Sequence, residues 1–85
     1  MKSFNYVVKD ALGIHARPAG LLAKEAKNFQ SKILLKKDDK EVDVSRLMAI
    51  MALGVKCGNQ VTVTADGPDE DAAIEALKKF FEEQL

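Results

Sequence analysis

The apolar residues of the chain recur with two spacings that predict seven elements. Alternation of apolar and polar residues, which is typical of half-buried strands, occurs at residues 2–8, 32–36, 41–44 and 61–65. Apolar residues three and four positions apart, which form one face of a helix, occur at residues 16–29, 45–54 and 69–81. The predicted order of elements is therefore β-α-β-β-α-β-α.

The strand pattern also predicts how the elements pack. Because apolar residues alternate along each strand instead of running continuously, helices should cover one face of the sheet and leave the other open to water. The 85 residues are enough for one modest core and too few for two. We therefore expect a single domain over residues 1–85 with an α/β two-layer open-faced sandwich fold. The pattern does not fix the order of the strands.

Turn and capping residues support the element boundaries. The polar residues Lys37–Lys40 lie between two strands and predict a hairpin turn. Ser45 is a candidate N-cap of the short helix that follows, and Gly54 is a candidate stop for it. The acidic residues at positions 69–71 suit the positive end of the last helix.

The helix predicted at residues 45–54 is apolar almost all round. A two-turn helix on a sheet can bury only one side, so we expect Ile50 and Leu53 in the core. Some of Leu47, Met48 and Met51 should then remain exposed. An exposed patch rich in methionine favours a surface for protein partners, because the thioether chain adapts to different shapes. Ordinary core packing is the alternative.

The single histidine of the chain lies at the predicted start of the first helix. Pro18 marks this start, because proline lacks an N–H that would be unpaired in the first turn. The first N–H groups of a helix point outward at the positive end of its dipole, so an anion beside His15 would meet backbone donors together with Arg17. The stretch Leu12–Gly20 therefore predicts a phosphate site. The alternative is that His15 only caps the helix.

Basic residues continue from this site along one side of the same helix. Four positions recur at helical spacing and form a basic stripe with a side-chain gap at its glycine: Arg17, Gly20, Lys24 and Lys27. A solvated helix face is the alternative interpretation. The net charge is zero, but residues 1–46 carry ten Lys and Arg against six Asp and Glu. The basic excess is therefore in the half of the chain that contains the histidine.

Few chemistries fit these residues. One histidine and the lone Cys57 cannot build a metal site, so we expect no metal and no cofactor. No serine or cysteine lies near His15 in the sequence, whereas a neutral imidazole can itself take a phosphoryl group on a ring nitrogen. His15 is therefore predicted to be the nucleophile. We expect Cys57 to be a small loop side chain, with a redox role as the alternative.

Composition argues against other classes of function. A net charge of zero and only five aromatic residues do not favour nucleic-acid binding by the basic stripe. No apolar run is long enough to span a membrane, and Met1–Phe4 lacks the apolar core of a signal peptide. We therefore expect no nucleic acid, no membrane insertion and a cytoplasmic location.

The residues around the histidine also resemble a known family. Gly13–Ala19 is similar to the active-site sequence of the HPr family, the histidine-containing phosphocarriers of the bacterial phosphoenolpyruvate-dependent sugar phosphotransferase system. The segment Leu47–Gly54 resembles the family too, as do Val61–Val63 and Asp66–Gly67. Chain length and element order agree with this resemblance, which covers essentially the whole chain.

The resemblance implies a role for each part of the site. His15 would accept a phosphoryl group at Nδ1 from phosphorylated enzyme I and pass it to the IIA domain of a sugar permease. Ala16 and Arg17, at the helix start, would hold the phosphate. These transient partners would dock on six residues of the apolar helix and the basic stripe: Gly20, Lys24, Lys27, Leu47, Met48 and Met51. The implied protein is a monomeric carrier with a phosphohistidine intermediate and not a stand-alone enzyme. Its sheet would have the strand order 1-4-2-3, with three helices on one face.

Two positions depart from the family. Many members carry a regulatory serine, modified by a kinase, at the N-cap of the short second helix, where this sequence has Arg46. Ser45 precedes it by one residue and is the remaining candidate for this regulation, although its hydroxyl would point in another direction. Leu12 stands where the family usually has a small polar residue, and the lost hydrogen bond is expected to change the transfer rate or the orientation of His15.

These departures leave a second function open. A regulatory binding module of the same fold, serving a nitrogen-related or dedicated branch of the phosphotransferase system, would act by phosphorylation-dependent binding to a regulator or an enzyme. Arg46 in place of the serine motivates this alternative.

Overall fold

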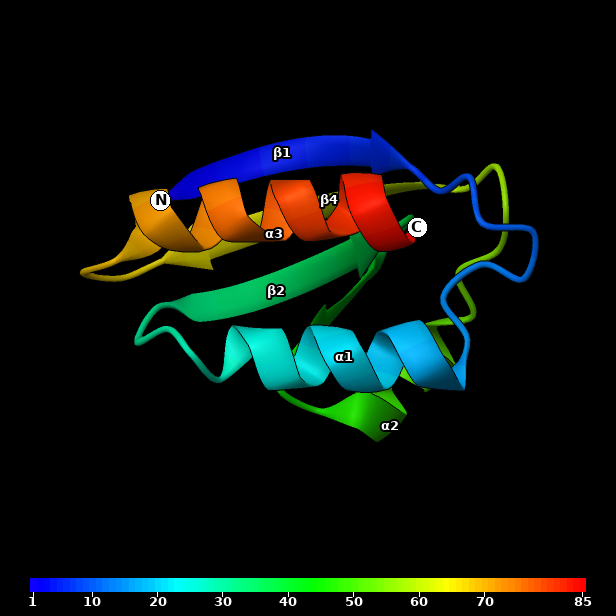
Figure 1. Ribbon diagram of the computed structural model, residues 1–85, viewed down its shortest axis with the longest axis horizontal. Coiled ribbons are helices and arrows are strands. Elements are labelled where there is room, and N and C mark those ends of the chain that lie inside the picture. The colour runs from blue at the N-terminus through cyan, green and yellow to red at the C-terminus, as the bar shows by residue number, and fades with distance from the viewer.

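The computed structural model describes residues 1–85 and contains four strands and three helices (Figure 1). In chain order the elements are β1 (Lys2–Val7), α1 (Ala16–Ala26), β2 (Lys32–Lys37), β3 (Lys40–Asp43), α2 (Leu47–Leu53), β4 (Gln60–Asp66) and α3 (Glu70–Gln84). The predicted order of elements is confirmed.

The four strands form one antiparallel sheet in the order β1-β4-β2-β3. This is the order that the family resemblance implied. Strands β1 and β4 lie side by side although four elements separate them in the sequence (Figure 1). The hairpin between β2 and β3 turns tightly, because Lys37 pairs with Lys40. Asp38 in this turn takes a φ of 55°, which aspartate tolerates better than most residues.

The helices lie on one face of the sheet and leave the other open, as predicted. Figure 1 shows α3 lying over β1 and β4, and α2 packs against α1 and β3. The buried side chains of β2 and β4 alternate along each strand: Ile33, Leu35, Val61, Val63 and Ala65. On the opposite face Thr62 donates a hydrogen bond of 2.7 Å to the side-chain oxygen of Asn5. The fold is therefore a two-layer open-faced sandwich.

The apolar faces of the helices complete the core. The longest helix, α3, buries Phe81, whose ring meets the rings of Phe4 and Tyr6 edge to face at centroid distances of 5.7 and 5.5 Å. Aromatic rings prefer this geometry, because the positive edge of one ring faces the negative face of the other. These contacts fix α3 over the edge strand β1.

The first helix is shorter than predicted. It ends at Ala26, with Lys27 as its C-cap, and not near Phe29. Its last turn tightens, because the N–H groups of Lys27 and Asn28 bond to carbonyls three residues earlier, at 3.2 and 3.1 Å. Phe29 lies beyond the end of α1 but still packs half-buried against the core. Its apolar position three residues after Ala26 therefore resembles that of one more helical turn.

The prediction that Ser45 is a helix N-cap is wrong. The N-cap of α2 is Arg46, whose carbonyl accepts the first helical hydrogen bond from the N–H of Ile50 at 3.1 Å. Ser45 instead donates its N–H and its hydroxyl to the Asp43 carboxylate, at 2.9 and 2.7 Å. The serine thus bonds to a carboxylate two residues earlier in the chain and not to the N–H groups at the start of the helix. Gly54 is confirmed as the C-cap, with a φ of 69°.

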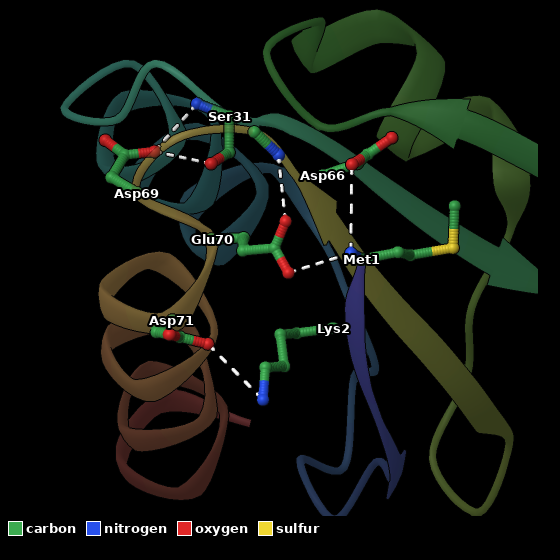
Figure 2. A network of polar contacts seen from close by, with 8 residues as sticks. Met1, Lys2, Ser31, Asp66, Asp69, Glu70 and Asp71 are labelled. Atoms are coloured by element: carbon green, nitrogen blue, oxygen red, sulfur yellow. Dashed lines mark hydrogen bonds and ion pairs between the residues drawn. The ribbon is translucent and has the colours of Figure 1, made fainter.

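A carboxylate before α3 holds the connection between α1 and β2. Asp69 accepts hydrogen bonds from the backbone N–H groups of Gln30 and Ser31, at 2.8 and 2.9 Å, and from the Ser31 hydroxyl. Figure 2 shows this cluster close to an ion pair of 2.8 Å between Glu70 and the Met1 ammonium group. Ser31 is buried, so its polar groups depend on this carboxylate.

Replacement of Asp69 tests this connection. The bonds from Ser31 and Gln30 hold the pKa of the Asp69 carboxyl below its ordinary value of 3.8. A carboxyl with a lowered pKa in the folded state stabilises the fold above its unfolded pKa, and this contribution is lost as the pH falls through the folded pKa. We therefore expect Asp69→Asn to lower the Tm at about pH 7 and to lower it much less below about pH 3.

The matched control is Asp71→Asn. It removes a carboxylate from the same end of α3, where Asp71 is exposed and makes an ion pair of 3.4 Å with Lys2. Thermal melts of both variants at the two pH values give the comparison. An equal loss of Tm in both at neutral pH would contradict a specific role for Asp69. The pKa values of the Asp43 and Glu70 carboxyls are also lowered by hydrogen bonds. Both variants should therefore still lose some stability at low pH.

Candidate functional site

His15 is the N-cap residue of α1. Its backbone is extended, with φ −95° and ψ −174°, and its carbonyl accepts a hydrogen bond of 2.9 Å from the N–H of Ala19. The side chain makes no capping hydrogen bond, and 37% of it is exposed. The imidazole ring therefore does not serve as a cap and is accessible at the helix start.

Two backbone donors are open beside the ring. The N–H groups of Ala16 and Arg17 have no hydrogen-bond partner in the protein. Pro18 is the third residue of the helix, as expected for a proline in the first turn, and it has no N–H to contribute. The Arg17 side chain is exposed. The helix start can thus hold an anion with two N–H groups and a guanidinium.

A tight turn brings the histidine to this position. Asp10–Gly13 has aspartate first and glycine fourth, the preferred residues of a type I turn. The N–H of Gly13 bonds to the Asp10 carbonyl, and the N–H of Leu12 bonds to the Asp10 carboxylate, both at 2.9 Å. The Asp10 N–H in turn bonds to the Leu85 carbonyl at 2.8 Å. The turn is therefore tied to the end of α3.

Gly13 is required where this turn meets the connection between α2 and β4. Its φ is +68°, and a Cβ at this position would lie 2.3 Å from the carbonyl oxygen of Val55. That oxygen accepts a hydrogen bond of 3.1 Å from the N–H of Ile14, and both residues are buried. A side chain at position 13 would push the turn away and displace His15.

The ring lines an open hollow of about 230 Å³. The hollow is lined by Asp10, His15, Arg17, Pro18, Leu21 and Gln84. The structure thus brings His15 and Arg17 together and adds Asp10, Leu21 and Gln84, which were not predicted from the sequence. The turn pattern of Asp10–Gly13 is the signal that could have pointed to Asp10. Gln84 comes from the far end of the chain and has no local signal.

The Asp10 carboxylate faces one nitrogen of the imidazole. Its Oδ1 lies 3.9 Å from Nε2 of His15, which is within ion-pair range but longer than a hydrogen bond. Nε2 is therefore the ring nitrogen that lies close to a carboxylate.

The helix α2 exposes the apolar side chains that its length predicted. Ile50 and Leu53 are buried, while Leu47, Met48 and Met51 are 38%, 75% and 41% exposed. Because α2 packs against α1, this apolar surface stands beside the helix that carries the basic stripe.

The basic stripe is exposed along α1. Lys24 and Lys27 are both exposed, although Lys27 is the C-cap and lies just beyond the helix. Gly20 is half-buried, and a Cβ there would meet no atom within 4 Å. The side-chain gap is therefore open surface and not a point of close helix packing.

The remaining candidate residues are also at the surface. Leu12 is 72% exposed beside the site, and Arg46 is exposed at the start of α2. Cys57 is a free, exposed cysteine whose Sγ lies 3.8 Å from the Lys9 carbonyl oxygen. No group of three His, Cys, Asp or Glu side chains is placed to hold a metal ion. None of the helices has the length and apolar character needed to cross a membrane.

The fold and the site together define a class of protein, a small open-faced sandwich that presents one histidine at an open helix start. Residues 2–83 match the family described as PTS HPr component phosphorylation site. The chain belongs to this family, the HPr phosphocarriers of the phosphotransferase system.

Individual relatives agree with this assignment. The phosphocarrier protein HPr of Mycoplasma capricolum subsp. capricolum is 42% identical over 79 residues, which are 93% of this chain and 89% of that protein. The crystal structure of HPr-C-His from Thermoanaerobacter tengcongensis superimposes with a TM-score of 0.93 at 43% identity, covering 98% of this chain and 93% of that one. The HPr-like protein Crh of Bacillus subtilis is 41% identical over 73 residues, 86% of each chain.

Alanine substitutions at two glycines test how the site is positioned. Gly13 and Gly54 have nearly the same left-handed backbone, with φ of +68° and +69°, but only Gly13 faces close neighbours. Gly54→Ala should cost about 1–2 kcal/mol from backbone strain alone. Gly13→Ala should cost a further amount of about 1–3 kcal/mol from the clash with Val55.

Urea denaturation of both variants measures the difference, and the NMR resonances of the His15 ring report displacement of the site. We expect ring shifts to change in Gly13→Ala and to stay close to the parent in Gly54→Ala. Equal destabilisation of the two variants would contradict the steric role of Gly13.

Proposed function

We propose that this chain accepts phosphoryl groups on Nδ1 of His15 from phosphorylated enzyme I and passes them to IIA domains of sugar permeases. The observation that carries the proposal is the accessible ring of His15 beside the unpaired N–H groups of Ala16 and Arg17. Membership of the HPr phosphocarrier family supports it.

The helix start provides what phosphoryl transfer requires. The reaction depends on alignment and on neutralisation of the charge on the phosphoryl oxygens more than on covalent help from the protein. The two N–H groups, the positive end of α1 and the Arg17 guanidinium supply these contacts. Nδ1 of His15 is the nucleophile, because Nε2 faces Asp10. The step needs no metal or cofactor from this chain.

We assign partner docking to the two neighbouring surfaces on α2 and α1. The exposed Leu47, Met48 and Met51 form an apolar surface that adapts to different partners. Lys24 and Lys27 add positive charge, which favours encounter with acidic partners. The open surface at Gly20 allows a partner close approach to the helix.

The carrier acts as a monomer in the cytoplasm, where its exposed free cysteine suits a reducing compartment. The proposed function does not include regulation through a serine at the start of α2. Arg46 occupies the N-cap, and the hydroxyl of Ser45 lies 2.7 Å from the Asp43 carboxylate. A phosphoryl group on that hydroxyl would be repelled by the carboxylate.

Phosphorylation in a reconstituted system tests the proposal. With enzyme I and phosphoenolpyruvate, the protein should gain one acid-labile phosphoryl group, detected by intact-protein mass spectrometry. His15→Ala should gain none, because the acceptor nitrogen is gone. Arg17→Ala should slow the transfer about 100-fold, and Arg17→Lys should recover part of the rate, because lysine keeps the charge without the planar donor fork.

Thr64→Ala, on the open face of the sheet away from the hollow, is the control and should be phosphorylated like the parent. A parent protein that stays unmodified, or a His15→Ala variant that is still modified, would contradict the carrier function.

A regulatory binding module is the second candidate, and the similarity to the HPr-like protein Crh favours it. The two functions differ in how long a partner stays bound. A carrier should release each partner after transfer, whereas a regulatory module should retain one in a phosphorylation-dependent manner. Pull-down of enzyme I, IIA domains and lysate proteins by the phosphorylated and unphosphorylated protein distinguishes these outcomes.

Substitution of the apolar surface tests docking. Met48 is 75% exposed, so Met48→Gln should leave the fold intact while it weakens contact with a partner. We expect the KM of enzyme I for this protein to rise about tenfold, which is the effect of losing one well-placed interface residue. Val7→Gln is the control, because Val7 is an exposed apolar residue (49%) on the edge strand β1. Equal changes in KM for both variants would contradict a docking role for Met48.

A further inference from the structure

In the proposed transfer step, the Asp10 carboxylate serves only as the group that Nε2 of His15 faces. Its Oδ1 is 3.9 Å from Nε2 of His15, and the two side chains are 31% and 37% exposed. Both line the same hollow, together with Arg17. The His15 ring is the only basic group within 4.0 Å of the Asp10 carboxylate.

Three hydrogen bonds fix where this carboxylate lies. The backbone of Asp10 donates to the Leu85 carbonyl at 2.8 Å and accepts from the N–H of Gly13 at 2.9 Å. Its Oδ1 accepts from the N–H of Leu12 at 2.9 Å. The main chain and the side chain are therefore both held, so the carboxylate is placed beside the ring before any partner binds.

A fixed carboxylate beside one nitrogen of an imidazole decides which nitrogen carries the proton. Neutral histidine has one protonated and one unprotonated ring nitrogen, and the hydrogen bond at one of them sets the identity of the other. The present gap of 3.9 Å exceeds a hydrogen bond. Contacts of this kind are often long in free proteins and shorten in the reacting complex.

We propose that Asp10 is a positioning residue that keeps the proton of His15 on Nε2, so that the lone pair of Nδ1 faces the incoming phosphoryl group. This inference rests on the proposed carrier function. A proton on Nδ1 would instead block the nucleophile, and the ring would have to change its tautomer before each transfer.

The same carboxylate acts during the transfer. The lone pair of Nδ1 forms the bond to phosphorus, while the bond from phosphorus to the donor breaks and its electron pair goes to the donor atom. The Nε2 proton stays on the ring, which gains positive charge. Asp10 offsets this charge from the side opposite to the phosphoryl group, as a carboxylate does for a histidine in an acid–base pair. The charge is lost again when the phosphoryl group leaves.

Two variants separate the carboxylate from the turn that it stabilises. The side-chain oxygen of asparagine or serine can also accept the N–H two residues later, so Asp10→Asn and Asp10→Ser keep the turn. Asparagine removes the charge, and serine is also too short to reach the ring. Asp38→Asn is the control, since Asp38 is an exposed acid in the hairpin between β2 and β3.

The decisive measurement is the tautomer ratio of the His15 ring by ¹⁵N NMR at about pH 9, a pH at which histidine side chains are generally neutral. We expect the parent and Asp38→Asn to carry the proton mainly on Nε2 and both Asp10 variants to shift toward Nδ1. Phosphoryl transfer from enzyme I should slow about tenfold in the Asp10 variants. The amide resonances of Gly13 and Ile14 should stay unchanged, which shows that the turn is intact.

An unchanged tautomer ratio would overturn the inference, even if transfer slows, because Asp10 would then act only through the turn. A shifted ratio with an unchanged transfer rate would equally overturn it. The NMR measurement needs no enzyme I, so it stands apart from the carrier function. If the parent itself is not phosphorylated, the carrier function fails; if the parent is phosphorylated and the variants behave like it, only the role of Asp10 fails.

Discussion

The hydrogen bond from the N–H of Ile14 to the Val55 carbonyl positions the functional end of the molecule. It joins the loop before α1 to the segment between α2 and β4, and it can form only because Gly13 has no side chain at the point of approach. This one contact therefore links the start of α1 to the end of α2 and to the segment that leads into β4. As a result, it holds the ring of His15 in a fixed position relative to the apolar surface of α2.

The features that could be predicted from the sequence depend on neighbours along the chain. Period-two and helical spacings located the strands and helices, and Gly54 after α2 marked its end. The exposure of Met48 followed from the length of α2, since two turns cannot bury all sides of an apolar helix. His15 at a helix start followed from its distance to Pro18. The full strand order came from the family resemblance, because local patterns predicted only the hairpin of β2 and β3 and do not show which distant strands pair.

The features that could not be predicted depend on contacts between distant segments or on a choice between two local partners. Asp69 bonds to Ser31 over a separation of 38 residues, and nothing near either residue indicates the other. Ser45 could bond either to the Asp43 carboxylate or to the N–H groups at the start of α2, and in the structure it bonds to the carboxylate. Phe29 reaches the core from outside α1, so its spacing could not show where the helix stops. The turn pattern of Asp10–Gly13 could have pointed to Asp10, but its distance from the His15 ring depends on how the turn folds back.

The third residue of α1 has a consequence for how firmly a phosphoryl group is held. Pro18 has no N–H, so this helix start offers one backbone donor fewer than a helix start without proline. A hydrogen bond to a charged group contributes about 1.5–3 kcal/mol, and its omission makes the phosphorylated state less stable by about tenfold or more in the equilibrium constant. In the proposed carrier function, the missing N–H of Pro18 weakens the hold of the site on a phosphoryl group. A weaker hold favours departure of the group to the next partner.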